Sequence, residues 1–416
     1  MTLRHLLSFP LLAALAAAPA FATNGYLQHG YGVKSQGMAG VGIALPQDGL
    51  AAATNPAGTA FVGNRIDVGA VWFRPSRGAE ISGNGAGLDG RYDGDDTRNF
   101  FIPELGYVRQ FGGDYAFGVA VYGNGGMNTD YSRNPFRSFG AQGNAGIDLA
   151  QVFVSPSLAW RITPDHAVGV AVNLAWQQFK AKGIQPFAGF SAAPGQVSDQ
   201  GRDDATGWGL RLGYTGRLSP TLTVGLTWAS KTRMGDFDKY RGLFAEGGGF
   251  DVPENYGAGL AWQATRALTL AADVQRIEYS GVPSVGRSLA PLFAGNPLGS
   301  DDGPGFGWRD VTVWKLGASY DWSDDLTLRA GYSHVSAPVP AGQTLLNILA
   351  PGVVRDHASV GATWKTAGGE LSLSYTRAFH ETVRGSASIP AVPFGGGEAD
   401  VHLSEHILGI AWGRAL

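Results

Sequence analysis

The sequence VTVWKLGASYDW occupies residues 311–322 and alternates between apolar and polar side chains with a period of two. Trp314, Leu316 and Tyr320 fall on one face, whereas Lys315 and Asp321 fall on the other. Successive side chains of a β-strand point to opposite faces. The pattern therefore predicts a strand that has one apolar wall and one polar wall.

The same alternation recurs along the chain in about fourteen segments. Their approximate centres are Val68, Tyr107, Val119, Val154, Val172, Leu210, Val224, Ala258, Leu270, Leu316, Leu328, Val360, Leu373 and Leu408. A soluble sandwich would bury the apolar face of each strand in a core. With so many such strands, and an even number of them, we instead predict an all-β fold, a transmembrane antiparallel β-barrel with lipid outside and water inside.

The connections between these segments are of two kinds. Short ones carry turn residues, as in Gly112-Gly113-Asp114 and Ser323-Asp324-Asp325. Long ones alternate with them, at 76–98, 127–148, 181–205, 234–252, 282–308, 339–352 and 386–400. Short turns at one rim and long loops at the other are typical of bacterial outer-membrane barrels, whose long loops face the outside of the cell.

The composition agrees with this location. Residues 1–22 have the basic start, the apolar middle and the Ala-Phe-Ala end of a secretory signal peptide, which implies export through the periplasm. After them, no apolar run approaches the ~20 residues that a membrane-spanning helix needs. The net charge is −3 and no basic stripe is present, so nucleic acid is a poor candidate partner.

Residues 23–63 precede the first strand-like segment and lack its alternation. They are rich in glycine and alanine, in a chain that has 63 glycines in total. The lumen of a wide barrel is not filled by side chains alone. We therefore predict three parts: a signal peptide (1–22), an N-terminal plug inside the lumen (23–63) and the barrel (64–416).

Four stretches resemble the FadL-type outer-membrane transporters, which carry long-chain fatty acids or aromatic hydrocarbons. They are SQGMAGVG (35–42), ATNPAG (53–58), VYGNGGM (121–127) and FDKYRGLFAEGG (237–248). The resemblance implies a monomeric fourteen-strand barrel with an N-terminal hatch. It also implies an extracellular apolar groove, a lumenal pocket, hatch movement, and lateral exit beside a kinked third strand.

The resemblance places candidate functional residues in two groups. The loop groove would use the apolar side chains Phe237, Leu243, Phe244 and Phe250. Hatch and gating positions would be Asn55, Pro56, Ala57, Gly123, Gly125 and Gly126. Proline fixes its own φ, and clustered glycines weaken a strand. The alternatives are an ordinary Asn-Pro turn, simple loop boundaries at the glycines, and loop phenylalanines that pack only against one another.

The face predicted to line the lumen carries both signs of charge. Arg211, Lys315 and Arg329 are candidate partners for the carboxylate of a fatty acid. Alternatively, these cations pair with Asp67, Asp273 or Asp321 across a wet lumen. A neutral hydrocarbon would need no cation.

We therefore expect passive uptake of hydrophobic small molecules by a protein surrounded by outer-membrane lipid and lipopolysaccharide. We expect no enzymatic activity, no cofactor and no metal. One alternative is an outer-membrane lipid hydrolase that uses Ser333 and His334, or Ser404 and His406. Another alternative is a general diffusion porin or a surface adhesin.

Overall fold

Fourteen antiparallel strands form a cylinder in the computed structural model, which describes residues 24–416. The predicted signal peptide and Thr23 lie outside the described residues. The ring strands are β1 (Arg65–Ser82), β3 (Phe100–Phe111), β4 (Tyr115–Asn128), β5 (Gly146–Thr163), β6 (His166–Lys182), β7 (Asp203–Ser219), β8 (Leu222–Ala229), β10 (Asn255–Gln263), β11 (Leu268–Ile277), β12 (Val311–Asp321), β13 (Leu326–Val335), β14 (Asp356–Thr366), β15 (Gly369–Val383) and β16 (Glu398–Ala415). Each predicted centre falls within one of them.

The ring closes where the last strand pairs with the first. The β1–β16 pairing runs from Arg65 opposite Ala415 to Ser82 opposite Glu398, so the barrel has no free edge there. Two further short strands lie outside the ring: β2 (Gly90–Asp93) pairs with β1, and β9 (Arg233–Met234) pairs with β7. Residues 76–82, predicted as loop, continue β1, because this end of the strand pairs with both β16 and β2.

The outer wall carries the predicted apolar face. Trp314 and Leu316 expose 59% and 61% of their surface, whereas Lys315 between them exposes 6%. Such an alternation suits lipid outside and a polar interior. No helix among residues 24–416 is long and apolar enough to cross a membrane.

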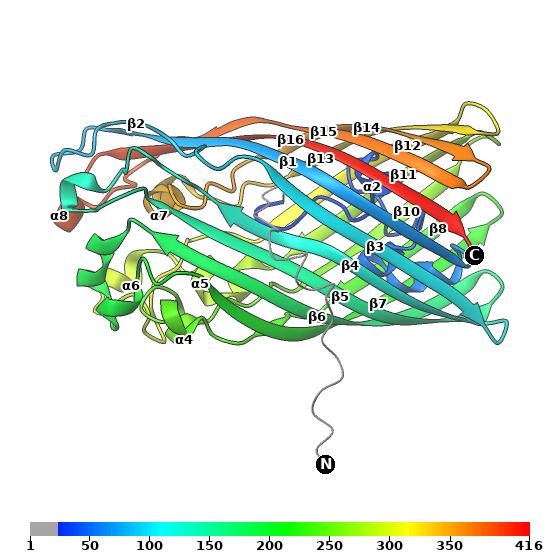
Figure 1. Cartoon of the computed structure of the whole chain (residues 1–416), viewed down its shortest axis with the longest axis horizontal. Helices are drawn as coiled ribbons and strands as arrows, with labels where there is room; N and C mark the ends of the chain where they lie inside the picture. Colours follow the sequence, from blue (N-terminus) through cyan, green and yellow to red (C-terminus); the bar gives the residue numbers. More distant parts are fainter. Residues whose placement is uncertain (1–23) are drawn as a thin grey trace, which may run out of the picture.

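Short helices lie in the long loops and before β1. The loop helices α4 to α8 gather at one end of the cylinder, and the C-terminus lies at the other end, beside the short turns (Figure 1). They are α4 (Ala245–Gly248), α5 (Pro283–Gly286), α6 (Ala290–Phe293), α7 (Thr344–Asn347) and α8 (Ala391–Phe394), and single 3-10 turns accompany them. The segment before β1 contains α2 (Val33–Gln36), α3 (Ala51–Thr54) and the 3-10 turn η1 (Pro56–Ala60).

Residues 24–63, here called the N-terminal segment, contact inward-facing groups from both sides of the ring. Glu104 of β3 accepts the backbone N–H groups of Gly32 and Val33, and Asp273 of β11 accepts those of Gly42 and Ile43. In Figure 1 the segment, in dark blue, lies among the strands. A buried backbone needs such partners because it has lost its water.

Candidate ligand-binding site

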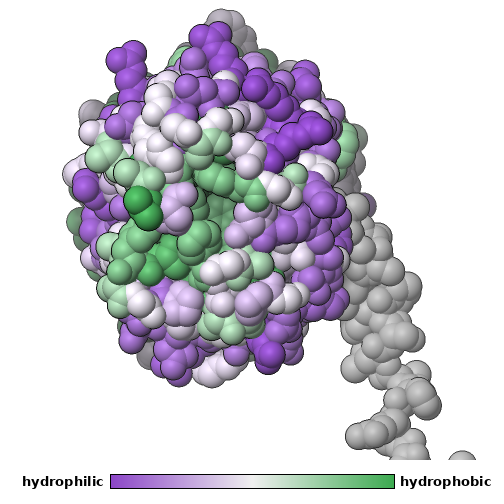
Figure 2. All heavy atoms as spheres, turned by 90° about the vertical axis from the view of Figure 1, so that its left-hand side faces the viewer, coloured by the Kyte–Doolittle hydropathy of each residue, from purple (hydrophilic) through white to green (hydrophobic). Residues whose placement is uncertain are grey.

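The long-loop end of the barrel contains an apolar cavity. In Figure 2 hydrophobic residues surround a hollow at this end of the molecule. The cavity is lined by Ile147, Phe179, Ile184, Phe187, Leu243, Phe244, Ser284, Leu298, Pro304, Gly305, Phe306, Leu346 and Leu349. The one polar side chain, Ser284, already donates its hydroxyl proton to the carbonyl of Gly249 at 2.6 Å. The cavity therefore suits an apolar ligand.

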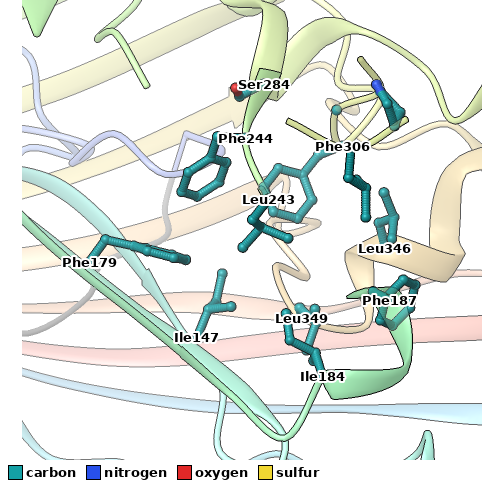
Figure 3. Close-up of a pocket in the computed structure, with 13 residues that line it drawn as sticks. Ile147, Phe179, Ile184, Phe187, Leu243, Phe244, Ser284, Phe306, Leu346 and Leu349 are labelled. Carbon is teal, nitrogen blue, oxygen red and sulfur yellow. The ribbon is translucent and has the colours of Figure 1, made fainter. Parts of the chain in front are cut away.

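Strands and loops that are distant in sequence supply this lining. Ile147 and Phe179 come from the ends of β5 and β6, and Leu243, Phe306 and Leu346 come from three different loops. Figure 3 shows Ile147, Leu243 and Phe244 facing the same space. Sequence reasoning missed the strand residues, although large apolar side chains at lumen-facing positions were an available signal.

Two of the four predicted groove residues line the cavity, and two do not. Leu243 and Phe244 are in the lining. The rings of Phe237 and Phe250 are fully buried beside it, at centroid distances of 5.5 Å from Phe179 and 4.9 Å from Phe244, respectively. The alternative that the loop phenylalanines pack against one another therefore describes Phe237 and Phe250, whereas a groove role for Leu243 and Phe244 stays a prediction. The loop folds back on itself, as the hydrogen bond from the Phe237 N–H to the Gly248 carbonyl shows, and its rings form a small core.

A second cavity lies between the N-terminal segment and the wall. Its lining includes Leu27, His29, Arg211, Ile277 and Lys315, so it is more polar than the first. An aromatic cluster lies between the two cavities. Tyr26 packs against Phe250 at 5.9 Å, Tyr279 at 5.3 Å and Trp308 at 5.9 Å between ring centroids.

The three candidate cations hold the N-terminal segment. Lys315 donates to the carbonyls of His29 and Gly40 at 2.8 and 3.1 Å. Arg211 donates to the carbonyl of Thr54 at 3.2 Å, and Arg329 donates to the Gln47 side chain at 2.9 Å. Within residues 24–416, no ion pair joins these cations to Asp67, Asp273 or Asp321. The acidic partners considered from sequence therefore do not occupy the N–H groups of these cations among the described residues.

Asn55 ties the N-terminal segment to β7. Its amide donates to the carbonyl of Ile43 at 2.8 Å, the carbonyl of Tyr214 at 2.9 Å and the hydroxyl of Thr215 at 3.1 Å. Its side-chain oxygen accepts the N–H of Ala57 at 3.1 Å and so caps η1, which begins at Pro56. Asn55 is extended, as a residue before proline must be.

The wall is interrupted at the predicted kink in β4. The β4–β5 register shifts between Gly123 and Gly125, and β3–β4 pairing stops at Leu105 opposite Val121. Beyond that point, the N-terminal segment takes the place of β3. Gly126 donates its N–H to the carbonyl of Tyr26 at 2.9 Å, and the Gln28 N–H bonds to Asn124 at 3.1 Å. The glycine cluster of β4 (Gly123, Gly125 and Gly126) therefore lies beside residues 26–28 of the N-terminal segment. The Asn55-Pro56-Ala57 sequence contacts a different part of the wall.

The residue pairs considered for hydrolysis are not assembled as catalytic groups. Ser333 is fully buried, whereas His334 bonds to Asp356 at 2.7 Å on the outer side. His406 bonds to Tyr375 and Arg377, and no hydrogen bond joins it to Ser404 among the described residues. Within residues 24–416, no group of three or more His, Cys, Asp or Glu side chains could hold a metal ion.

Comparison with known proteins agrees with the geometry. The sequence model of a family described as outer membrane protein transport protein (OMPP1/FadL/TodX) matches residues 10–384. No curated protein sequence is significantly similar to the chain. Three similar crystal structures share its fold: the toluene transporter TodX of P. putida (21% identity, TM-score 0.68, 93% of this chain and 99% of that chain), a FadL homologue of Pseudomonas aeruginosa (18%, 0.71, 94% and 99%) and the toluene transporter TbuX of Ralstonia pickettii (20%, 0.64, 93% and 99%).

These neighbours are transport channels and not enzymes, and their barrels belong to the bacterial outer membrane. The closed ring, the apolar outer wall and the family match together identify the protein's class. The chain belongs to the OMPP1/FadL/TodX family of outer membrane transport proteins, which carry hydrophobic compounds.

Proposed function

We propose that this protein admits neutral apolar molecules through the apolar cavity at its long-loop end. The observation that carries the proposal is the lining itself, whose one polar side chain is already hydrogen-bonded. An apolar solute gains free energy by leaving water for such a lining, at about 25 cal/mol per Å² buried. Transport would then follow the solute's own concentration gradient.

The proposed route continues through the aromatic cluster to the second cavity. Phe250 packs against Phe244 of the first cavity and against Tyr26. The next residue, Leu27, lines the second cavity. Tyr26 therefore blocks the direct line between the cavities, and displacement of residues 24–31 would open it. In this proposal the N-terminal segment acts as a hatch or plug.

The proposed exit is lateral, through the interrupted wall beside β4. There residues 26–28 bond to β4 where β3 no longer does. Movement of this part of the hatch would open a path to the bilayer. An apolar solute would take this path, because its free energy is lower in the bilayer than in the periplasmic water. Because the ring closes through its own β1 and β16, we propose that one chain suffices as a monomer.

The substrate class depends on which polar groups beside the cavities lack a hydrogen-bond partner among the described residues. The similar structures TodX and TbuX are named toluene transporters, and the first cavity suits a monoaromatic hydrocarbon or another neutral apolar compound. A long-chain fatty acid needs a partner for its carboxylate. Arg211 borders the second cavity, and its buried Nε has no partner among the described residues. Fatty acid is therefore the second candidate substrate.

Uptake by cells that lack other channels for apolar solutes tests this function. Phe244→Asp places a charge in the cavity and should lower the initial rate of toluene uptake at least tenfold. Phe293→Asp, at a half-exposed loop position outside the cavity lining, should leave the rate within twofold. Maltose uptake should be unchanged in both variants. Equal toluene uptake by wild type and Phe244→Asp would refute the proposed role of the cavity.

Conductance separates this function from the general diffusion porin. A plugged carrier should conduct few ions in a planar bilayer, whereas an open porin conducts strongly. Oleate uptake that falls in Arg211→Gln while toluene uptake does not would assign Arg211 to the fatty-acid carboxylate.

A further inference from the structure

Three basic side chains lie next to one another on the outer surface of β1, β15 and β16. In the strand registers, His406 of β16 stands opposite both Arg74 of β1 and Arg377 of β15. Residues directly opposite in antiparallel strands have Cβ atoms about 5 Å apart, and like charges at such positions destabilise a sheet. Arg74 and His406 are exposed, and Arg377 is partly exposed.

These basic side chains form no ion pair among the described residues. Arg377 donates to His406 Nε2 at 2.6 Å, and His406 Nδ1 lies 2.8 Å from the Tyr375 hydroxyl oxygen. Across residues 24–416, no ion pair involves Arg74, Arg377 or His406. The guanidinium of Arg377 therefore fixes His406 Nε2 as an acceptor, and both arginines keep N–H groups free.

Two outward-facing basic residues on other strands, Arg276 and His334, do have acidic partners. Arg276 of β11 pairs with Glu278 and Asp310, each at 3.3 Å, and His334 of β13 pairs with Asp356 at 2.7 Å. Compensation of charge is thus possible on this wall. The surface formed by β15, β16 and β1 lacks this compensation by acidic side chains. Its arginines are therefore available to an external anion.

The position of the surface indicates which anion. Arg74 follows Trp72 by two residues, Arg377 follows Tyr375 by two, and His406 precedes Leu408 by two. Tyr375 and Leu408 expose 38% and 47% of their surface on the apolar outer wall. At about 3.4 Å per residue, the basic groups lie about 7 Å farther along their strands, toward the long loops. We expect the headgroups of the outer leaflet near this edge of the apolar wall, and in the outer membrane these are the headgroups of lipopolysaccharide.

We propose that Arg74 and Arg377, which flank the ring of His406, form a binding site for a lipopolysaccharide phosphate group, with the lipid's acyl chains against Tyr375 and Leu408. Arginine presents paired N–H groups that match two phosphate oxygens. The site rests on the protein's place in the outer membrane and is independent of the proposed transport route.

Binding of fluorescent bisphosphorylated lipid A to the purified full chain in detergent tests the site. The double variant Arg74→Gln, Arg377→Gln should bind at least tenfold more weakly than wild type. Arg276→Gln, whose arginine already has acidic partners, should stay within twofold. Dephosphorylated lipid A should bind wild type and the double variant equally. Heat-modifiable migration on gels confirms that each variant retains its barrel.

Three results would overturn the proposal. One is unchanged lipid A affinity in the folded double variant, and another is an equal loss in Arg276→Gln. The third is inorganic phosphate that displaces lipid A from wild type at concentrations equal to those of lipid A, which would show a site for free phosphate and not for a lipid.

Discussion

Asn55 shows what one side chain contributes to the closed state of the channel. Its amide and its carbonyl oxygen make hydrogen bonds to Ile43, Tyr214, Thr215 and Ala57, and the side chain is buried. No other residue type supplies two donors and an acceptor on so short a side chain, because aspartate only accepts and glutamine is longer. The Asn-Pro-Ala sequence therefore holds the N-terminal segment against β7.

Replacement of Asn55 by alanine should loosen this attachment. The lost hydrogen bonds correspond to about 1–3 kcal/mol of local stability. We expect Asn55→Ala to raise the mean ion conductance in planar bilayers, because the segment leaves its position more often. Asn99→Ala, which removes one exposed hydrogen bond to Trp72, is the control and should not change conductance. Identical currents from Asn55→Ala and wild type would show that Asn55 has no part in closure.

Asp48 makes the attachment of the segment depend on pH. Burial and the nearby charge of Asp67 raise the pKa of the Asp48 carboxyl to about 6. The folded state therefore binds this proton more tightly than the unfolded chain does. An aspartate in an unfolded chain has a pKa of about 3.9. This group stabilises the packed segment most at low pH, and its contribution is lost as the pH rises through about 6.

Hydrogen exchange at two pH values measures this dependence. After correction for intrinsic rates, peptides from residues 42–55 should be better protected at pH 5 than at pH 7.5. Asp48→Asn cannot ionise and should reduce that difference, with residual dependence from other groups. A difference of the same size in Asp48→Asn would exclude Asp48 as its source.

At the scale of elements, inward-facing glycines let the N-terminal segment lie directly on the strands. A β-carbon at Gly331 of β13 would lie 2.3 Å from the carbonyl carbon of Met38, and one at Gly169 of β6 would lie 2.4 Å from the backbone nitrogen of Ala57. Backbone cannot retreat from such contacts as a flexible side chain can. Part of the glycine excess is therefore a requirement of close packing between segment and wall.

Gly331→Ala should displace the segment near Met38 without unfolding the barrel. Overpacking of this kind costs about 1–3 kcal/mol. We expect faster hydrogen exchange in residues 35–43 and unchanged exchange in the ring strands. Gly368→Ala, in a turn where an added β-carbon meets nothing within 4 Å, is the matched control. Unchanged exchange at residues 35–43 in Gly331→Ala would contradict the close packing.

The sequence predicted the strands well and the cavities poorly, for a physical reason. The period of two is local, so each strand carries its own signal, as at Trp314 to Trp322. The first cavity instead requires Leu243, Phe306 and Leu346 from three loops to meet, and no local pattern specifies that meeting. The attachment of Lys315 to the N-terminal segment could not be predicted for the same reason. Its partners are backbone carbonyls of that segment, whose sequence has no periodicity.

On the scale of the whole molecule, the protein combines a closed barrel, an apolar cavity at its long-loop end and an N-terminal segment that contacts the inner side of the ring. The barrel supplies a rigid wall, because fourteen strands pair around a complete ring. The N-terminal segment is attached to it largely by hydrogen bonds to inward-facing side chains, which can be exchanged for water. In the proposed function, the N-terminal segment is the part that moves and the barrel is the part that stays fixed.

A reversible covalent tether between segment and wall tests the central claim most directly. The chain has no cysteine, so an introduced pair stands alone. A β-carbon at Gly409 of β16 would lie 3.0 Å from Cγ2 of Val33, which places Val33→Cys and Gly409→Cys within reach of a disulfide. The single variants control for the substitutions themselves. We predict that oxidation of the double variant abolishes toluene uptake and that reduction restores it, whereas undiminished uptake with the disulfide formed would contradict passage past a moving N-terminal segment.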